Sequence, residues 1–218
     1  GHTAYEAGKP IEKREPKIDA ALVKKAYSSM NCHPVTPENL ACGKKALIGL
    51  IAHEIVTDDL GYADAPSVKD DILKVAVVER HHDSGHIGLG YIKGYGLKKG
   101  AVATSVAHDS HNIIAVGATD EDIAAAINAV IAAKGGIFVT DGNVTEGLAL
   151  PIAGLMSDMP LEKTNAVLES VKDFAYSLGV SREIDPFMTL SFLSLPVIPK
   201  VKITTRGVFD VVKWQYKE

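Results

Sequence analysis

The chain has 218 residues, of which 46% are hydrophobic and 23% charged, and its formal net charge is −4 at pH 7. This mix is close to that of an average globular protein and supplies enough apolar residues for one sizeable core. An acidic balance, without a run of Lys and Arg interleaved with aromatics, argues against nucleic acid as a partner. No apolar run reaches the roughly 18 residues of a membrane-spanning helix and no signal-peptide pattern occurs, so we expect no membrane partner and a cytoplasmic location.

The sequence divides into an irregular N-terminal arm, residues 1–43, and one α+β domain, residues 44–218. Four prolines punctuate the arm and confine any helix to about residues 19–30, where apolar side chains recur every four positions. Cys32 and Cys42 match neither a Cys-x-x-Cys motif nor a zinc spacing. We therefore expect free thiols in a reducing compartment.

Runs of β-branched and apolar residues between turn residues predict the strands of the domain. The predicted strands are residues 45–57, 72–79, 87–92, 101–107, 112–116, 137–140, 144–150, 188–193, 201–204 and 208–212. A loop is expected at residues 61–66. The sequence Asp-Gly-Asn at residues 141–143 predicts a hairpin turn, because Asp-Gly tolerates the positive φ angles that such a turn needs.

Two amphipathic helices are predicted within the domain. A variant capping box at residues 119–122 opens the first, and a glycine pair at residues 135–136 closes it. The second begins near Pro160, with Asp158 as a candidate N-cap. Because several neighbouring strands are linked too tightly for crossovers, we expect a mixed, mostly antiparallel sheet covered by the two helices.

Two short polar clusters follow predicted strands and hold five of the eight histidines. The first includes Glu79, Arg80, His81 and His82, and the second is His108, Asp109, Ser110, His111 and Asn112. Histidine titrates near neutral pH and binds transition metals, so these clusters are the best candidate site. Both interrupt a run of β-formers with residues that prefer turns, and we expect them on one rim of the sheet.

Three interpretations of the second cluster are open. His108 and His111, with Asp109 as a hard third ligand, could hold a metal ion. Alternatively, the short polar side chains could bond to nearby backbone and form a structural corner. A polar lid face over a site supplied by another part of the protein is the interpretation that we prefer.

Other patterns favour structural roles. The alternating glycines within residues 85–100 fit no nucleotide-binding loop and indicate close backbone approach or a bulge. His53 and Glu54 lack the second histidine of His-Glu-x-x-His and are expected to be an ordinary surface or strand pair. Phe187 and Met188 are assigned mainly to the core, with a pocket wall as the alternative.

Residues 108–114, His-Asp-Ser-His-Asn-Ile-Ile, resemble a signature of the C-terminal region of adenine deaminases of the amidohydrolase superfamily. Further blocks agree in the family's order, at residues 74–82, 87–98, 150–158 and 185–193. The resemblance covers roughly residues 72–211. Five blocks in one order are far more specific than any single motif.

The resemblance implies a parent enzyme that converts adenine and water to hypoxanthine and ammonia with a divalent metal, Mn, Fe or Zn. Its metal ligands and catalytic aspartate would lie on a TIM barrel, which needs about 250 residues. We therefore expect this chain to be the C-terminal part without the barrel, with no catalytic residue and no cofactor of its own. Gly1 and His2 are interpreted as a tag remnant.

The expected role is a lid or assembly domain that is inactive alone. The turns at residues 79–82 and 108–112 would form the lid. Its expected partners are the barrel of the same enzyme, adenine in the parent site and further copies in a homo-oligomer. The alternatives are a non-catalytic binding or oligomerisation module and an independent metal hydrolase that uses its own His and Asp residues.

Overall fold

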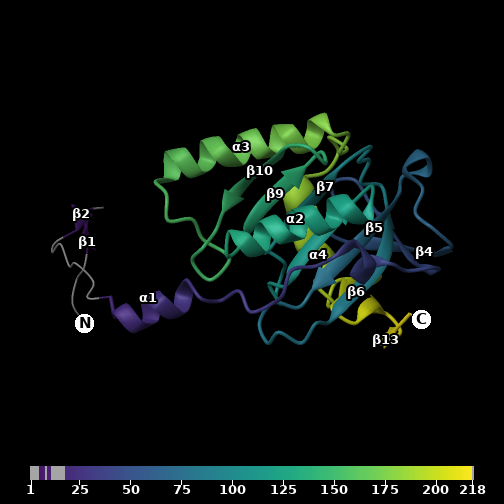
Figure 1. Cartoon of the computed structure of the whole chain (residues 1–218), viewed down its shortest axis with the longest axis horizontal. Helices are drawn as coiled ribbons and strands as arrows, with labels where there is room; N and C mark the ends of the chain where they lie inside the picture. Colours follow the sequence, from purple (N-terminus) through teal and green to yellow (C-terminus); the bar gives the residue numbers. More distant parts are fainter. Residues whose placement is uncertain (1–4, 8, 11–17, 218) are drawn as a thin grey trace.

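The computed structural model describes residues 5–7, 9–10 and 18–217 (Figure 1). The helices are α1 (Ala20–Ala26), the 3₁₀ turns η1 (Pro37–Leu40) and η2 (Val68–Asp70), α2 (Asp120–Ala132), α3 (Leu161–Ser177) and α4 (Pro186–Leu193). The strands are β1 (Tyr5–Glu6), β2 (Lys9–Pro10), β3 (Lys45–Leu50), β4 (Thr57–Ala63), β5 (Ile72–Val78), β6 (Ile87–Lys93), β7 (Ala101–Thr104), β8 (Ile113–Gly117), β9 (Gly136–Thr140), β10 (Thr145–Ala149), β11 (Val201–Thr204), β12 (Gly207–Asp210) and β13 (Gln215–Tyr216).

Eight strands form the central sheet in the order β10-β9-β7-β8-β5-β6-β3-β4. Neighbours are antiparallel except β3 and β6, which run parallel. The predicted β9–β10 hairpin is present, and the Asp141 carboxylate stabilises its turn by accepting the backbone N–H groups of Asn143 and Val144. The α+β class with a mixed, mostly antiparallel sheet is confirmed.

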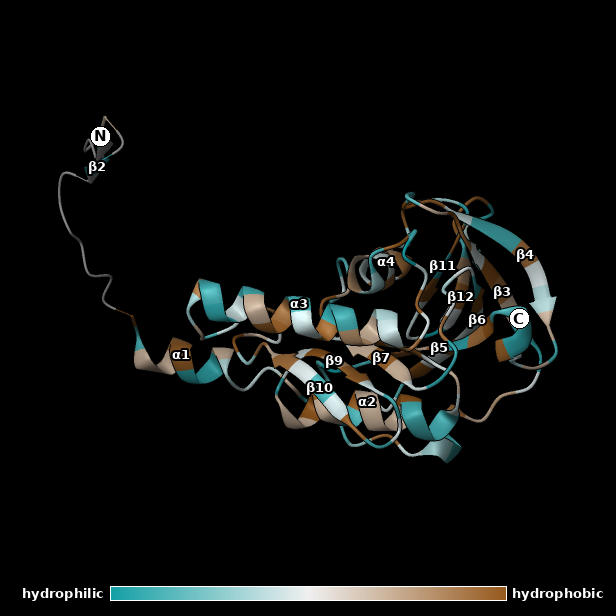
Figure 2. Cartoon of the chain, turned by 90° about the horizontal axis from the view of Figure 1, so that it is seen from above, coloured by the Kyte–Doolittle hydropathy of each residue, from teal (hydrophilic) through white to brown (hydrophobic). Residues whose placement is uncertain are grey.

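The two predicted helices cover the sheet from opposite faces (Figure 2). Helix α2 begins as predicted, because the Thr119 hydroxyl accepts the backbone N–H of Asp122, and it buries Ile123, Ile127 and Val130 against one face. Helices α3 and α4 pack on the other face with a three-stranded sheet, β11-β12-β13. Among the described residues, no helix combines the length and the apolar character that a bilayer-spanning segment needs.

Strand β6 has glycine at the positions that face the three-stranded sheet. A Cβ added to Gly88 would lie 1.8 Å from the carbonyl oxygen of Thr204, and one added to Gly90 would lie 2.7 Å from Cγ2 of Val208. The backbones of the two sheets therefore approach more closely than any side chain would allow. Of the two predicted reasons for the glycines within residues 85–100, close backbone approach or a bulge, close approach is confirmed for Gly88 and Gly90.

The strand predicted at residues 188–193 is wrong, because this segment is helix α4. Asp185 is its N-cap and accepts the backbone N–H groups of Phe187 and Met188 at 3.0 and 2.9 Å, while Pro186 occupies the first helical position. Both are helix-start signals. They decide the structure over an apolar run that resembles a buried strand.

The strand predicted at residues 45–57 is also corrected. It ends at Leu50, and a second strand, β4, begins at Thr57 and covers the first half of the loop predicted at residues 61–66. Three further boundaries differ: α1 ends at Ala26, β7 ends at Thr104, and Asp158 does not cap α3, which begins after Pro160 without a side-chain cap. Strand β4 lies at an edge of the sheet, where polar residues and glycine are tolerated.

Part of the predicted arm packs on the domain. Val35 and Leu40 are buried against α2, and the Asn128 amide of α2 bonds to both the N–H and the carbonyl of Val35 at 2.8 Å. Helix α1, by contrast, has no buried residue. The division at residue 43 stays a prediction, although the contacts of Val35 and Leu40 tie the end of the arm to the core.

Candidate functional site: the histidine rim

The two polar clusters leave the sheet at the same edge. Val78, the last residue of β5, pairs with Ile113, the first residue of β8. The loop that follows β5 and the loop that precedes β8 are therefore neighbours. The Nε2 atom of His81 lies 2.8 Å from the carbonyl oxygen of Ser110, which joins the two loops directly. We call the residues of this surface the histidine rim: His81, His82, His108, Asp109, Ser110 and His111.

Glu79 supports the rim from within. Its carboxylate accepts the backbone N–H groups of His81, His82 and Ser84, and also the hydroxyl of Ser84, at 2.6–3.3 Å. Burial alone would raise the pKa of this carboxyl, but the N–H and O–H donors outweigh burial and lower the pKa to about 2. Glu79 is therefore a charged acceptor that shapes the loop.

Arg80 is the second internal support and is almost completely buried. Its Nε donates to the carbonyl of His111 at 2.5 Å, Nη1 to that of Ser29 at 3.1 Å, and Nη2 to that of Ala153 at 3.0 Å. Gly154 has φ +73°, and a Cβ there would lie 2.8 Å from Nη1, so the neighbouring loop closes tightly over the guanidinium. One side chain thus ties the rim to two distant segments.

Three aromatic rings stack at the rim. The His108 ring lies 5.5 Å from Phe192 of α4 and 6.5 Å from His111, with interplanar angles below 30°. His108 Nδ1 contacts the carboxylate of Asp109. Nδ1 of His111 is buried and has no hydrogen-bond partner among the described residues, and burial followed by the Arg80 charge lowers its pKa.

This environment selects one form of His111. A buried nitrogen without an acceptor disfavours a proton on Nδ1, and a nearby guanidinium charge disfavours the imidazolium. The neutral tautomer with hydrogen on Nε2 fits both conditions. The accessible part of the ring then offers a hydrogen-bond donor.

The metal interpretation of His108, His111 and Asp109 finds no support. Within residues 5–7, 9–10 and 18–217, no three His, Cys, Asp or Glu side chains are placed to hold a metal ion. The Asp109 carboxylate turns to the ring of its neighbour His108, and the Nδ1 atom of His111 is buried. The rim residues do not fit a metal site.

The nine predicted site residues therefore divide into two groups. Glu79, Arg80 and Asn112 are internal supports, and the Asn112 side-chain oxygen accepts the backbone N–H of Arg80 at 3.4 Å. The other six form the partly or fully exposed histidine rim. The polar residue types predicted where the candidate site lies. The sequence pattern did not show which of these residues are internal supports and which are exposed on the histidine rim.

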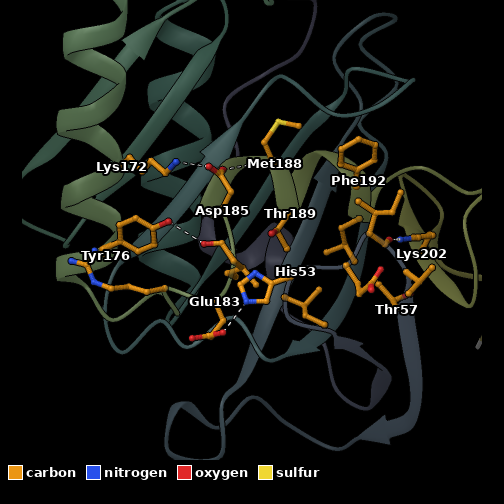
Figure 3. Close-up of a pocket in the computed structure, with 17 residues that line it drawn as sticks. His53, Thr57, Lys172, Tyr176, Glu183, Asp185, Met188, Thr189, Phe192 and Lys202 are labelled. Atoms are coloured by element: carbon orange, nitrogen blue, oxygen red, sulfur yellow. Dashed lines mark hydrogen bonds and ion pairs between the residues drawn. The ribbon is translucent and has the colours of Figure 1, made fainter.

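Sequence reasoning missed a cavity of about 440 Å³ beside α4 (Figure 3). It lies between the turn that joins β3 to β4, the end of α3, helix α4 and strand β11. His53 is an exposed turn residue at this cavity, and Met188 lines it, whereas Phe187 is in the core. Phe192 lines the cavity and also stacks on His108, so one ring borders both regions.

The fold and the rim together define an α+β domain with a polar surface that buried hydrogen bonds hold in place. Within the described residues it has no metal-binding cluster. Residues 52–215 match the model of the adenine deaminase C-terminal domain, and the chain belongs to this family.

Several curated relatives are named adenine deaminases. "Adenine deaminase 2" of Carboxydothermus hydrogenoformans is 45% identical over 224 residues, which cover 97% of this chain and 38% of the relative. The adenine deaminase of Listeria welshimeri is 52% identical over 152 residues, covering 69% and 26% of the two chains. That of Desulfatibacillum aliphaticivorans is 49% identical over 177 residues, covering 78% and 31%. The chain thus spans between a quarter and two fifths of the length of these relatives.

Proposed function

We propose that this chain serves as the C-terminal domain of an adenine deaminase, which converts adenine and water to hypoxanthine and ammonia. The names of the relatives and the family match support this assignment. In this proposal a partner barrel domain of the parent enzyme would supply the divalent metal (Mn, Fe or Zn) and the catalytic residues, and this chain would supply neither.

The rim is proposed as the lid that this domain presents to the substrate site. The observation that carries this role is the His111 ring, fixed by stacking on His108 and by the Arg80 contact with its backbone carbonyl. Purine ring nitrogens accept hydrogen bonds, and a neutral Nε2–H group donates one without bringing a charge. His111 would orient the base while the rim excludes water.

Exchange of C-terminal domains tests this function. The chain replaces the corresponding region of the Carboxydothermus hydrogenoformans enzyme, with which it shares 45% identity, and ammonia release from adenine is measured. We expect activity in the fusion and none in the isolated chain supplied with Mn²⁺, Fe²⁺ or Zn²⁺. Turnover by the isolated chain would contradict the assignment.

Variants of the fusion test the lid. His111→Ala should lower kcat/KM about tenfold, as expected for one hydrogen bond of about 1.4 kcal/mol, and His111→Gln, which keeps an N–H donor, should recover part of the loss. His86→Ala is the matched control, because it removes an exposed histidine from the neighbouring loop. Unchanged kinetics in His111→Ala would instead identify the rim as a structural corner, or the domain as a non-catalytic binding or oligomerisation module.

Two further assignments accompany the proposal. Cys32 and Cys42 are free thiols, as expected for a reducing compartment, and they support a cytoplasmic enzyme. We also propose that the enzyme assembles into a homo-oligomer, and sedimentation of the active fusion measures its size.

A further inference from the structure

The cavity beside α4 combines an apolar wall with charged groups (Figure 3). Its apolar lining comes from Leu50, Ile55, Val56, Met188, Phe192 and Leu193. At about 440 Å³ it lies within the size range of small-molecule sites, which are concave and mostly apolar with a few placed polar groups.

Most charged groups of the lining already have partners. The Lys172 ammonium lies 2.7 Å from the Asp185 carboxylate, and the His53 ring lies 2.9 Å from the Glu183 carboxylate. The guanidinium of Arg182 lies over the ring of Tyr176 at 4.8 Å. In Figure 3, Lys172 and Tyr176 lie on one side of the cavity and Lys202 lies on the opposite side.

Lys202 is different, because the residue is 0% exposed and, among the described residues, no carboxylate forms an ion pair with it or contributes to its pKa. The ammonium donates to the carbonyl oxygen of Ile55 at 2.6 Å, which accounts for one of its three N–H donors. Burial lowers the pKa of this lysine to about 8, and no neighbouring charge contributes to the shift. A buried charge with so few partners is costly unless something else compensates it.

We propose that the cavity binds a small organic carboxylate with an apolar body. The carboxylate accepts from the Lys202 ammonium at the inner end, and the apolar body packs on Phe192, Met188 and neighbouring lining residues. An anion supplies the missing opposite charge and the missing acceptors at once, whereas a neutral ligand supplies at most the acceptors. The apolar lining favours an organic acid over an inorganic anion.

This site is separate from the histidine rim. Phe192 lies between them, with one side on His108 and the other in the cavity. Neither adenine nor the proposed partner domain is needed for a ligand to bind in this cavity, so binding there is independent of the proposed deaminase function.

Benzoate and benzamide test the charge requirement on the full chain. The two probes have the same shape, and only benzoate carries a carboxylate. By isothermal titration at pH 7 we expect benzoate to bind at least tenfold more tightly than benzamide. At pH 10 about one Lys202 in a hundred remains charged in the free protein, so benzoate affinity should fall more than tenfold. Equal affinity for the two probes, or benzoate affinity independent of pH, would overturn the proposal.

Two variants locate the site. Lys202→Met keeps an unbranched side chain that is one atom shorter and removes its charge, and it should abolish the preference for benzoate. Lys200→Met is the matched control, since Lys200 is mostly exposed and pairs with Asp58 at 2.8 Å outside the cavity. Thermal melting shows whether each variant is folded, and Lys202→Gln serves as a second variant if Lys202→Met is not. Full benzoate binding by a folded Lys202 variant would also refute the site.

Discussion

The histidine rim and the cavity hold their buried charges in opposite ways. At the rim, Arg80 donates to three carbonyl groups and Glu79 accepts from three N–H groups and one hydroxyl. In the cavity, Lys202 has one acceptor among the residues that the structure describes, the carbonyl of Ile55. Burial removes water from all three charged groups, which is unfavourable. Hydrogen bonds within the chain offset this cost for Arg80 and Glu79 but only in small part for Lys202.

The number of hydrogen-bond partners separates the two kinds of charge. Arg80 and Glu79 hold the fold together, whereas Lys202 is proposed to bind a ligand. Removing a buried charge that holds several segments leaves its partners unsatisfied and destabilises the protein. Removing one that has few partners relieves a desolvation cost. Substitutions in the two regions should therefore change stability with opposite signs.

Arg80→Met should give the largest effect, a loss of about 4 kcal/mol in the free energy of unfolding, because it leaves three buried carbonyls without their donor. Urea denaturation followed by circular dichroism measures it. Arg182→Met, at an exposed arginine, should change stability by less than about 0.5 kcal/mol. If the two variants were equally stable, Arg80 would not be the anchor described here.

Glu79→Gln should cost somewhat less, about 2 to 3 kcal/mol at pH 7, because an amide has one acceptor atom where the carboxylate has two. The pKa of Glu79 is lowered from 4.5 to about 2, and its side chain is only 11% exposed. Its contribution is therefore fully present above pH 4.5 and is lost as the pH falls towards 2. Unfolding from pH 7 to 2.5 should show the variant and the wild type converging.

Glu54→Gln is the control for this series, since Glu54 is an exposed turn residue. It should follow the wild-type curve throughout. A constant difference between Glu79→Gln and the wild type down to pH 2.5 would show that shape, and not charge, explains the loss.

Lys202→Met should show the smallest effect and the opposite sign, a gain of about 1 to 2 kcal/mol at pH 7. The folded-state pKa of about 8 lies below the ordinary value of 10.5, so the unfolded chain binds more protons between these values. Wild-type stability relative to the variant should therefore rise from pH 8 to pH 10.5 and level off above it. A variant less stable than the wild type at pH 7 would place Lys202 with the rim charges.

Local sequence signals predicted the elements that have them. The Thr119 cap, the Asp141 turn and the β-rich run of β5 each specify their structure within a few residues. Helix α4 is not predicted, because the apolar run of residues 188–193 resembles a buried strand although Asp185 and Pro186 mark a helix start. Strand β4 was missed because its two aspartates and glycine are unfavourable in a central strand, and the pattern does not reveal an edge.

The supports of the candidate site depend on contacts that are distant in sequence. Arg80 acquires its role from the carbonyls of Ser29 and Ala153, 51 and 73 residues away. Lys202 alternates with apolar residues in β11 and so resembles a solvent-facing strand residue, but the turn that carries Ile55 covers it. The composition of a strand and the spacing of its residues do not show which distant segment packs over it.

At Gly88 and Gly90, strand β6 presents only its backbone to the three-stranded sheet. The three-stranded sheet packs on β6 because side chains are absent at these two positions. A related sequence with bulky residues at both positions would have to seat its last three strands elsewhere. A relative that has glycine at both positions is therefore expected to have room for the three-stranded sheet against β6.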